Sequence, residues 1–326
     1  MNNNLLTRLL VVAVVFWCEA TIARVAKNQR FEVPVYSREV PFLDITVGHS
    51  AALSMFIDTG AGGIRIHPGN LGPNDVKHTG QRNQIMYGDG NSGIEGEVVL
   101  GKVKIGDFAV PGETSIQAID KHVCRPGYEN RCEREGSKHG GAGTIGLGTF
   151  HPADLRSKVK KEAAVFNPLI QQGPVSYILK VPRSDGQSGA LIINPTAQEK
   201  SRFVTIALTP GKDKTIPVCI HRHCFIAALD TGTVGNQIPI VTKRDAKQLG
   251  LPDDDGKVVS GTKIPIVLGS GRNTFALELT ATAKGPGRYT LKESGKERGV
   301  LGIDIFRYID VLYDFDAGVI GVAPKK

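Results

Sequence analysis

Short apolar segments separated by turn residues run along most of the chain. Residues 53–57 and 225–229 are two such segments, and an aspartate directly follows each of them. Two more flank a glycine-rich turn, at residues 84–86 and 97–100. Short apolar segments bounded by glycine or proline are typical of β-strands. The 39 glycines and 18 prolines among 326 residues supply the turns that such strands need. The pattern therefore predicts many short strands joined by tight turns, rather than a helical protein.

Helical signals are confined to two short stretches, at residues 154–164 and 242–249. In the second stretch, Thr242 stands at the expected N-cap, and Gly250 follows the last expected helical position. Threonine caps free N–H groups of a first helical turn, and glycine adopts the left-handed conformation that often ends a helix. We therefore expect two short helices in an otherwise strand-rich chain.

The first 23 residues differ in composition from the rest of the chain. Arg8 precedes an apolar run at residues 9–17, and small residues follow up to Ala20 and Ala23. The run is too short to cross a hydrocarbon core of about 30 Å. It predicts a signal peptide over residues 1–23, cleaved after Ala20 or Ala23, in preference to an uncleaved membrane anchor. No later segment is apolar enough to span a membrane. The protein is then secreted, with a lysosome-like or vacuolar destination as the alternative.

The cysteines fit an oxidising compartment. Cys18 lies in the signal segment, and the other four form two close pairs along the chain. Four cysteines allow three connectivities, and the sequence alone does not choose among them. Pairing of nearest neighbours closes the shortest loops at the lowest entropic cost. We therefore expect disulfides between Cys124 and Cys132 and between Cys219 and Cys224, as an oxidising environment would preserve.

The segment from Cys219 to Cys224 also contains His221 and His223, so a metal site is an alternative interpretation. Structural zinc sites hold four ligands in a tetrahedron and separate their ligand pairs by longer loops. This segment is too short to wrap all four side chains around one ion. The disulfide is therefore the favoured interpretation, and no metal is expected.

A formal net charge of +8 raises the question of a polyanionic partner. Basic proteins can attract nucleic acids and anionic surfaces. Here lysine and arginine are scattered, and clusters occur only at residues 158–161 and 325–326. We interpret the charge as a solvated surface and expect no nucleic-acid partner.

An internal repeat carries the strongest functional signal. Residues 56–61 (FIDTGA) and 228–233 (ALDTGT) share an aspartate, a threonine and a glycine at matching places. Each copy is followed by a second matched segment, at residues 144–150 and 300–306, in which apolar residues precede a glycine. The same order in both halves indicates a duplicated lobe.

Each copy places an aspartate at the end of an apolar strand, where backbone N–H groups of the turn can reach its carboxylate. The shared residues are Asp58, Thr59 and Gly60 in the first copy, and Asp230, Thr231 and Gly232 in the second. Glycine permits the sharp turn, and each threonine can bond to its counterpart in the other lobe. Two carboxylates brought together in this way cannot both ionise. The pair then shares one proton and contains both an acid and a base.

These motifs resemble the pepsin family of aspartic proteases. Residues 87–96 (YGDGNSGIEG) are similar to the hairpin, called the flap, that folds over bound peptide in that family. Residues 299–324 resemble its C-terminal signature, so the similarity covers nearly the whole chain after the signal segment. The resemblance implies an all-β bilobal fold, with an N-terminal lobe at residues 31–184 and a C-terminal lobe at residues 185–326.

The resemblance also implies an activity. Family members are endopeptidases in which a water between two aspartates attacks the peptide carbonyl, without a metal or an organic cofactor. Carried over to this chain, Asp58 and Asp230 are the catalytic residues of a monomeric enzyme that acts on polypeptides in extended conformation. The residues expected to contact substrate are Gly60, Tyr87, Gly88, Asp89, Gly232 and Thr233, whereas Thr59 and Thr231 hold the site together.

Two positions depart from the family pattern. Ala61 stands where pepsins usually have serine, whereas the second copy keeps a hydroxyl at Thr233. A hydroxyl that donates to a carboxylate favours its charged form. Its loss at Asp58 is therefore expected to move the acid limb of the pH profile towards neutral by about one unit. Arg65 replaces a tryptophan that bonds the flap tyrosine in many relatives, so Tyr87 either finds another partner or stays mobile.

A non-catalytic binding or inhibitor protein on the same scaffold is the alternative function. Such proteins usually lose an aspartate or distort the motif, and this chain retains both aspartates. An enzyme is therefore the favoured interpretation.

Overall fold

The structure, a computed structural model, describes residues 29–87, 92–127, 129, 140–148, 164–171, 176–184, 187–210, 215–240, 249–254, 256–285, 287–293 and 298–325. The predicted signal peptide at residues 1–23 lies outside these ranges. In the described part of the chain, no helix has both the length and the apolar character needed to span a membrane.

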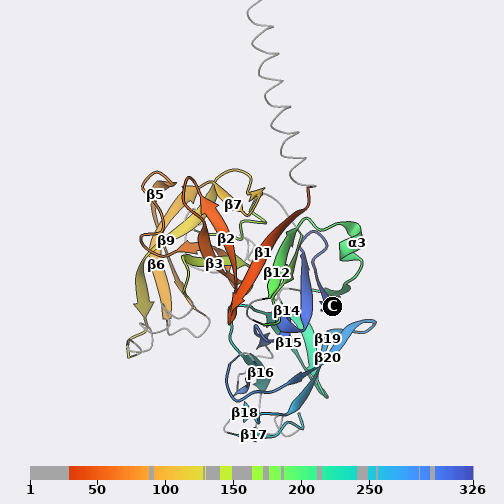
Figure 1. Cartoon of the computed structure of the whole chain (residues 1–326). Coiled ribbons are helices and arrows are strands. Elements are labelled where there is room, and N and C mark those ends of the chain that lie inside the picture. The colour runs from red at the N-terminus through yellow and green to blue at the C-terminus, as the bar shows by residue number, and fades with distance from the viewer. Residues whose placement is uncertain are drawn as a thin grey trace, which may run out of the picture.

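The described residues form two β-sheets (Figure 1). The larger sheet has 15 strands: β1 (Phe31–Arg38), β2 (Val40–Val47), β3 (Leu53–Asp58), β4 (Gly62–Ile66), β5 (Val76–Met86), β6 (Ser92–Gly101), β7 (Val103–Ile105), β8 (Phe108–Ala109), β9 (Thr114–Cys124), β10 (Gly143–Leu147), β11 (Tyr177–Lys180), β12 (Ser188–Ile193), β13 (Val204–Ala207), β23 (Ile309–Asp314) and β24 (Val319–Pro324). The smaller sheet has nine: β14 (Thr215–Ile220), β15 (His223–Leu229), β16 (Asn236–Ile240), β17 (Asp253–Asp254), β18 (Lys257–Val258), β19 (Lys263–Ser270), β20 (Asn273–Thr280), β21 (Tyr289–Glu293) and β22 (Arg298–Leu301). The described helical elements are short: α3 (Ala197–Lys200) and the 3₁₀ turn η3 (Ile305–Arg307).

Strands β2 and β3 illustrate how the sequence pattern builds the core. In β2, Leu43 and Ile45 are buried on either side of the exposed Asp44. This alternation follows because successive side chains of a strand point to opposite faces. In β3, Met55 and Ile57 are fully buried in the same apolar core. Burial of these side chains fixes the end of β3, and with it the position of the aspartate that closes the strand.

The internal repeat has a structural counterpart in the strand pairing. In the first copy, β3 pairs in parallel with β10, which pairs antiparallel with β4 on its other side. In the second copy, β15 pairs in parallel with β22, which pairs antiparallel with β16. Each aspartate turn therefore lies beside a glycine-containing strand from later in its own half. The all-β fold with a duplicated β unit, predicted from the repeat and the resemblance, is confirmed.

The sequence predicts a lobe boundary between residues 184 and 185, which falls between β11 and β12. These two strands pair with each other, and β11 also pairs with β23 from the end of the chain. The larger sheet thus contains strands from both predicted lobes, whereas β14–β22 form the smaller sheet (Figure 1). The exact boundary stays a prediction. The two predicted helices, at residues 154–164 and 242–249, lie almost wholly outside the described residues.

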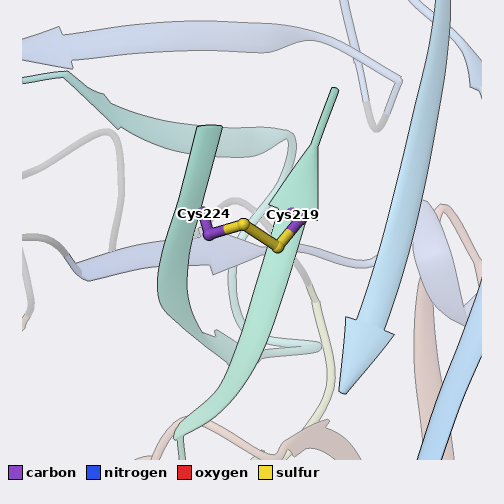
Figure 2. The surroundings of a disulfide bond; sticks show 2 residues. All are labelled: Cys219 and Cys224. Atoms are coloured by element: carbon purple, nitrogen blue, oxygen red, sulfur yellow. A yellow bond between two sulfur atoms is a disulfide. The ribbon is translucent and has the colours of Figure 1, made fainter. Parts of the chain in front are cut away.

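The disulfide between Cys219 and Cys224 is present (Figure 2). The two cysteines lie directly opposite each other on the adjacent strands β14 and β15, with 4.1 Å between their Cα atoms. Both sulfur atoms are used in the bond, which removes the thiolates that the alternative zinc site would need. Cys132 lies outside the described residues, so its pairing with Cys124 stays a prediction.

Candidate active site

Two threonines join the two aspartate turns to each other. The backbone N–H of Thr59 donates to Oγ1 of Thr231 at 3.0 Å, and the N–H of Thr231 donates to Oγ1 of Thr59 at 3.0 Å. Each hydroxyl in turn donates to a backbone carbonyl of the other turn, that of Leu229 at 3.0 Å and that of Ile57 at 2.7 Å. Both threonine side chains are buried. This symmetrical set of hydrogen bonds fixes the separation of the two turns.

The threonine contacts lead to a stability prediction. Thr231→Val keeps the shape of the side chain but removes its hydroxyl. The buried N–H of Thr59 and the buried carbonyl of Ile57 then lose the hydrogen bonds that they make with this hydroxyl. We expect the free energy of unfolding to fall by about 2–6 kcal/mol, because each of the two buried unpaired groups costs about 1–3 kcal/mol. Denaturant unfolding measures this change. Thr231→Ser, which keeps the hydroxyl, serves as the control and should lose much less; equal losses for the two variants would contradict the hydrogen-bond explanation.

The threonine contacts bring the two carboxyl groups together. Asp58 and Asp230 lie within hydrogen-bonding reach of each other. The glycine of each turn lies against the aspartate of the opposite turn. A methyl group added to Gly60 would lie 2.4 Å from the Asp230 carboxyl, and one added to Gly232 would lie 2.5 Å from Oδ1 of Asp58. The two turns therefore interlock, and a side chain fits at either glycine only if the facing carboxyl moves away.

The two aspartates receive different sets of hydrogen bonds. Oδ1 of Asp58 accepts from the backbone N–H groups of Gly60 at 2.8 Å and Ala61 at 3.0 Å. Asp230 accepts from the N–H of Gly232 on Oδ1 and from the hydroxyl of Thr233 on Oδ2, both at 2.8 Å. The second turn thus supplies a hydroxyl donor that the first turn lacks, because Ala61 has none.

Burial and the neighbouring carboxylate of Asp230 together raise the pKa of Asp58 to about 7, while the N–H of Gly60 and the guanidinium of Arg65 oppose this rise. Two carboxylates in contact cannot both ionise without strong repulsion. The pair therefore holds a single proton over a range of acidic to neutral pH. Such a pair combines a base and an acid within one site, which is what hydrolysis by a bound water requires.

Tyr87 closes the hairpin formed by β5 and β6. Its backbone N–H donates to the carbonyl of Ser92 at 2.8 Å, and its side chain is 42% exposed. Tyr87 interacts electrostatically with both Arg65 and Asp58. The predicted flap tyrosine therefore lies close to the carboxyl pair. Gly88 and Asp89, the other predicted flap residues, lie outside the described residues.

Two residues that the sequence did not assign to the site lie next to it. Arg65, noted in the sequence only as a departure from the family pattern, interacts electrostatically with Asp58 and Tyr87. Its signal was a charged residue within the otherwise apolar segment GGIRI. Tyr313, on β23, is buried and interacts with both aspartates. Nothing in the apolar segment around Tyr313 distinguished it from an ordinary core residue.

Comparison with known proteins supports the assignment of the fold. No family model matches the sequence, and no curated protein matches it. Among solved structures, the chain is similar to the aspartic proteinase from Irpex lacteus, with a TM-score of 0.67. The match covers 91% of this chain and 98% of that chain, at 16% sequence identity. The similarity thus extends over most of the chain. The chain therefore has the pepsin-like fold of the aspartic proteinases.

Proposed function

We propose that the protein is an aspartic endopeptidase. One observation carries the proposal: Asp58 and Asp230 face each other across two turns that Thr59 and Thr231 join symmetrically. The raised pKa of Asp58 supports a pair with one shared proton. Because an ordinary surface aspartate has neither such a partner nor such a pKa, a purely structural role explains this arrangement poorly.

The reaction is general acid–base hydrolysis of a peptide bond. A water bound between Asp58 and Asp230 gives a proton to the ionised carboxylate and attacks the peptide carbonyl carbon. The protonated carboxyl donates its proton to the carbonyl oxygen, which forms a tetrahedral intermediate without a covalent bond to the enzyme. The carboxyl that took the proton from water then donates it to the amide nitrogen, the C–N bond breaks, and a hydroxyl proton of the intermediate returns to the other carboxylate. The hydrogen bonds between Thr59 and Thr231 keep the acid and the base at a fixed position relative to each other. The residues of the pair are sufficient for this chemistry, so the proposal includes no metal or organic cofactor.

The substrate is a polypeptide in extended conformation. The hairpin of β5 and β6 supports this proposal, because it ends in two partly exposed apolar side chains, Met86 and Tyr87, on a segment that approaches Asp58. An extended peptide placed between this hairpin and the carboxyl pair can bond its backbone to the hairpin edge. Gly60, Gly232 and Thr233 lie immediately around the pair and are the proposed contacts on the opposite side.

The proposed site of action is outside the cell, with an acidic lysosome-like or vacuolar compartment as the alternative. The signal-like segment at residues 1–23 and the disulfide between Cys219 and Cys224 support it, because disulfides persist in oxidising compartments. We propose that the enzyme acts as a monomer, since one chain supplies both aspartates.

The proposal is tested by incubating the purified protein with a denatured protein substrate from about pH 3 to pH 7. We expect cleavage that a statine-type inhibitor abolishes, because its hydroxyl group occupies the place of the attacking water. Peptide binding without cleavage at any pH in this range would instead favour the non-catalytic binding protein on the same scaffold.

A further inference from the structure

Arg65 is a buried cation beside the carboxyl pair. It lies in β4, with 7% of its surface exposed. Within the described part of the chain, Arg65 forms no ion pair, and its Nε has no hydrogen-bond partner. Burial of a charge is costly unless an opposite charge lies close enough to compensate it. Asp58 is the carboxyl group with which Arg65 interacts electrostatically.

Arg65 is also tied to the first aspartate turn by hydrogen bonds. Its Nη1 donates to the backbone carbonyl of Gly62 at 2.7 Å and contacts that of Gly63 at 3.4 Å. Gly62 directly follows Ala61, whose N–H donates to Asp58. A planar guanidinium that binds adjacent carbonyls restrains the backbone between them. Arg65 therefore holds the part of the turn that orients Asp58.

The hydrogen bonds divide the roles of the two aspartates. Asp230 accepts a donor on each oxygen, one of them the hydroxyl of Thr233. Both donors in the first turn, the N–H groups of Gly60 and Ala61, bind Oδ1 of Asp58, which leaves Oδ2 to carry a proton. Hydrogen bonds to a carboxylate favour its charged form. When the pair holds one proton, the hydrogen bonds thus favour an ionised Asp230 and a protonated Asp58.

The titratable and charged groups that interact with Asp58 come from four elements. Asp230, after β15, opposes its ionisation. Tyr87, after β5, and Tyr313, on β23, are uncharged phenols at acidic and neutral pH, since burial raises the pKa of both. Arg65, on β4, is the cation among these groups, and it favours the ionised form of Asp58.

We infer that Arg65 is a positioning residue for the proposed peptidase reaction. Its hydrogen bonds hold the turn that contains Asp58 in place, and its positive charge lowers the pH up to which Asp58 keeps the shared proton. This inference rests on the proposed function and assigns the acid role to Asp58 and the base role to Asp230. Loss of the proton from the acid ends activity at high pH, so Arg65 acts on the alkaline limb of the pH profile. By the same asymmetry, the missing hydroxyl at Ala61 acts on the alkaline limb rather than on the acid limb expected from the sequence.

The kinetic test compares the pH profiles of kcat/KM for variants at two positions. Arg65→Gln removes the charge, so we expect the alkaline limb to move to higher pH by roughly one unit. Arg65→Lys keeps the charge and should leave the limb in place, although it loses the planar contact with Gly62. Adding Ala61→Ser to Arg65→Gln should move the limb back towards its wild-type position. Arg30→Gln, which removes a surface charge with the same change in net charge, is the matched control and should move nothing.

A second measurement does not depend on turnover. Carboxyl-labelled aspartate allows the two titrations to be followed by NMR, with Asp58→Asn used to assign the signals. We expect Asp58 to titrate well above the ordinary range of an aspartate, and its midpoint to rise in Arg65→Gln. An ordinary midpoint for Asp58, or the same shift in Arg65→Lys as in Arg65→Gln, overturns the inference. If Arg65→Gln does not fold, Arg65→Met takes its place, and the wild-type titration still decides which carboxyl holds the proton. Titrations that agree with the inference in a protein without peptidase activity would reject the proposed function alone.

Discussion

Replacement of Asp58 or of Asp230 by asparagine is expected to lower kcat/KM for peptide hydrolysis by about 10³-fold or more. Asparagine keeps the size of the side chain and can still accept the backbone hydrogen bonds of its turn. It neither takes a proton from water nor donates an acidic one, so the pair loses either its base or its acid. Because the two residues act as a unit, the double variant should lose little beyond either single variant. Steady-state kinetics on purified, folded variants measures these losses. Appreciable peptidase activity in either single variant would contradict the proposed mechanism.

The same Asp58→Asn variant should gain stability relative to the wild type as the pH rises. The pKa of Asp58 is raised in the folded protein from 3.8 to about 7, so the unfolded chain ionises this group at lower pH than the folded protein does. The stability that protonated Asp58 contributes is fully present below the unfolded value and is lost as the pH approaches the folded value. Asparagine does not titrate, so the difference in Tm between variant and wild type should widen in favour of the variant across this window. A constant difference would contradict the raised pKa.

The sequence was sufficient to find the central residues of the site because their signal is local and occurs twice. Asp58 and Asp230 stand in near-identical hexapeptides, and a turn that ends a buried strand needs the same residue types in both. The bonds of Thr59 and Thr231 followed from the same duplication, since two equivalent turns related by a pseudo-twofold axis can bond each other in both directions.

The remaining features depend on contacts between distant segments, which no local pattern reveals. The pairing of β11 with β23 brings the end of the chain into the larger sheet, although more than a hundred residues separate the two strands. The burial of Arg65 and its proximity to Asp58 follow from how β4 packs, whereas the sequence shows only an arginine in an apolar segment. Which aspartate keeps the proton depends on the hydrogen-bond donors around each carboxyl group. These donors can be identified only from the folded structure of both turns.

Gly60→Ala is the second change expected to cause a large loss of activity, and it acts without removing any catalytic group. The added methyl group would lie 2.4 Å from Oδ1 and Oδ2 of Asp230, closer than non-bonded atoms approach. The carboxyl of Asp230 must therefore move away, which separates it from Asp58 and from the attacking water that we propose between them. A displacement of about 1 Å in a reacting group can cost about 10²-fold in rate, so we expect kcat/KM to fall by about that factor. Gly232→Ala should have a similar effect through Asp58, because its methyl group would lie 2.5 Å from Oδ1 of that residue.

Stability measurements distinguish this effect from unfolding. Gly60 is not among the glycines with positive φ, so alanine fits its backbone conformation, and rotation of one carboxyl relieves the contact. The free energy of unfolding of Gly60→Ala should fall by about 1–3 kcal/mol, because the displaced carboxyl of Asp230 loses hydrogen bonds, and the variant should stay folded under the assay conditions. Gly72→Ala is the matched control, because its methyl group would meet only the carboxyl end of Asp75, at 3.0 Å, and it should keep wild-type kinetics. Wild-type kcat/KM in Gly60→Ala would mean that the two turns separate enough to accept a side chain between them. A Gly60→Ala variant that is unfolded under the assay conditions would mean that the glycine serves the fold and not the alignment of the two carboxyl groups.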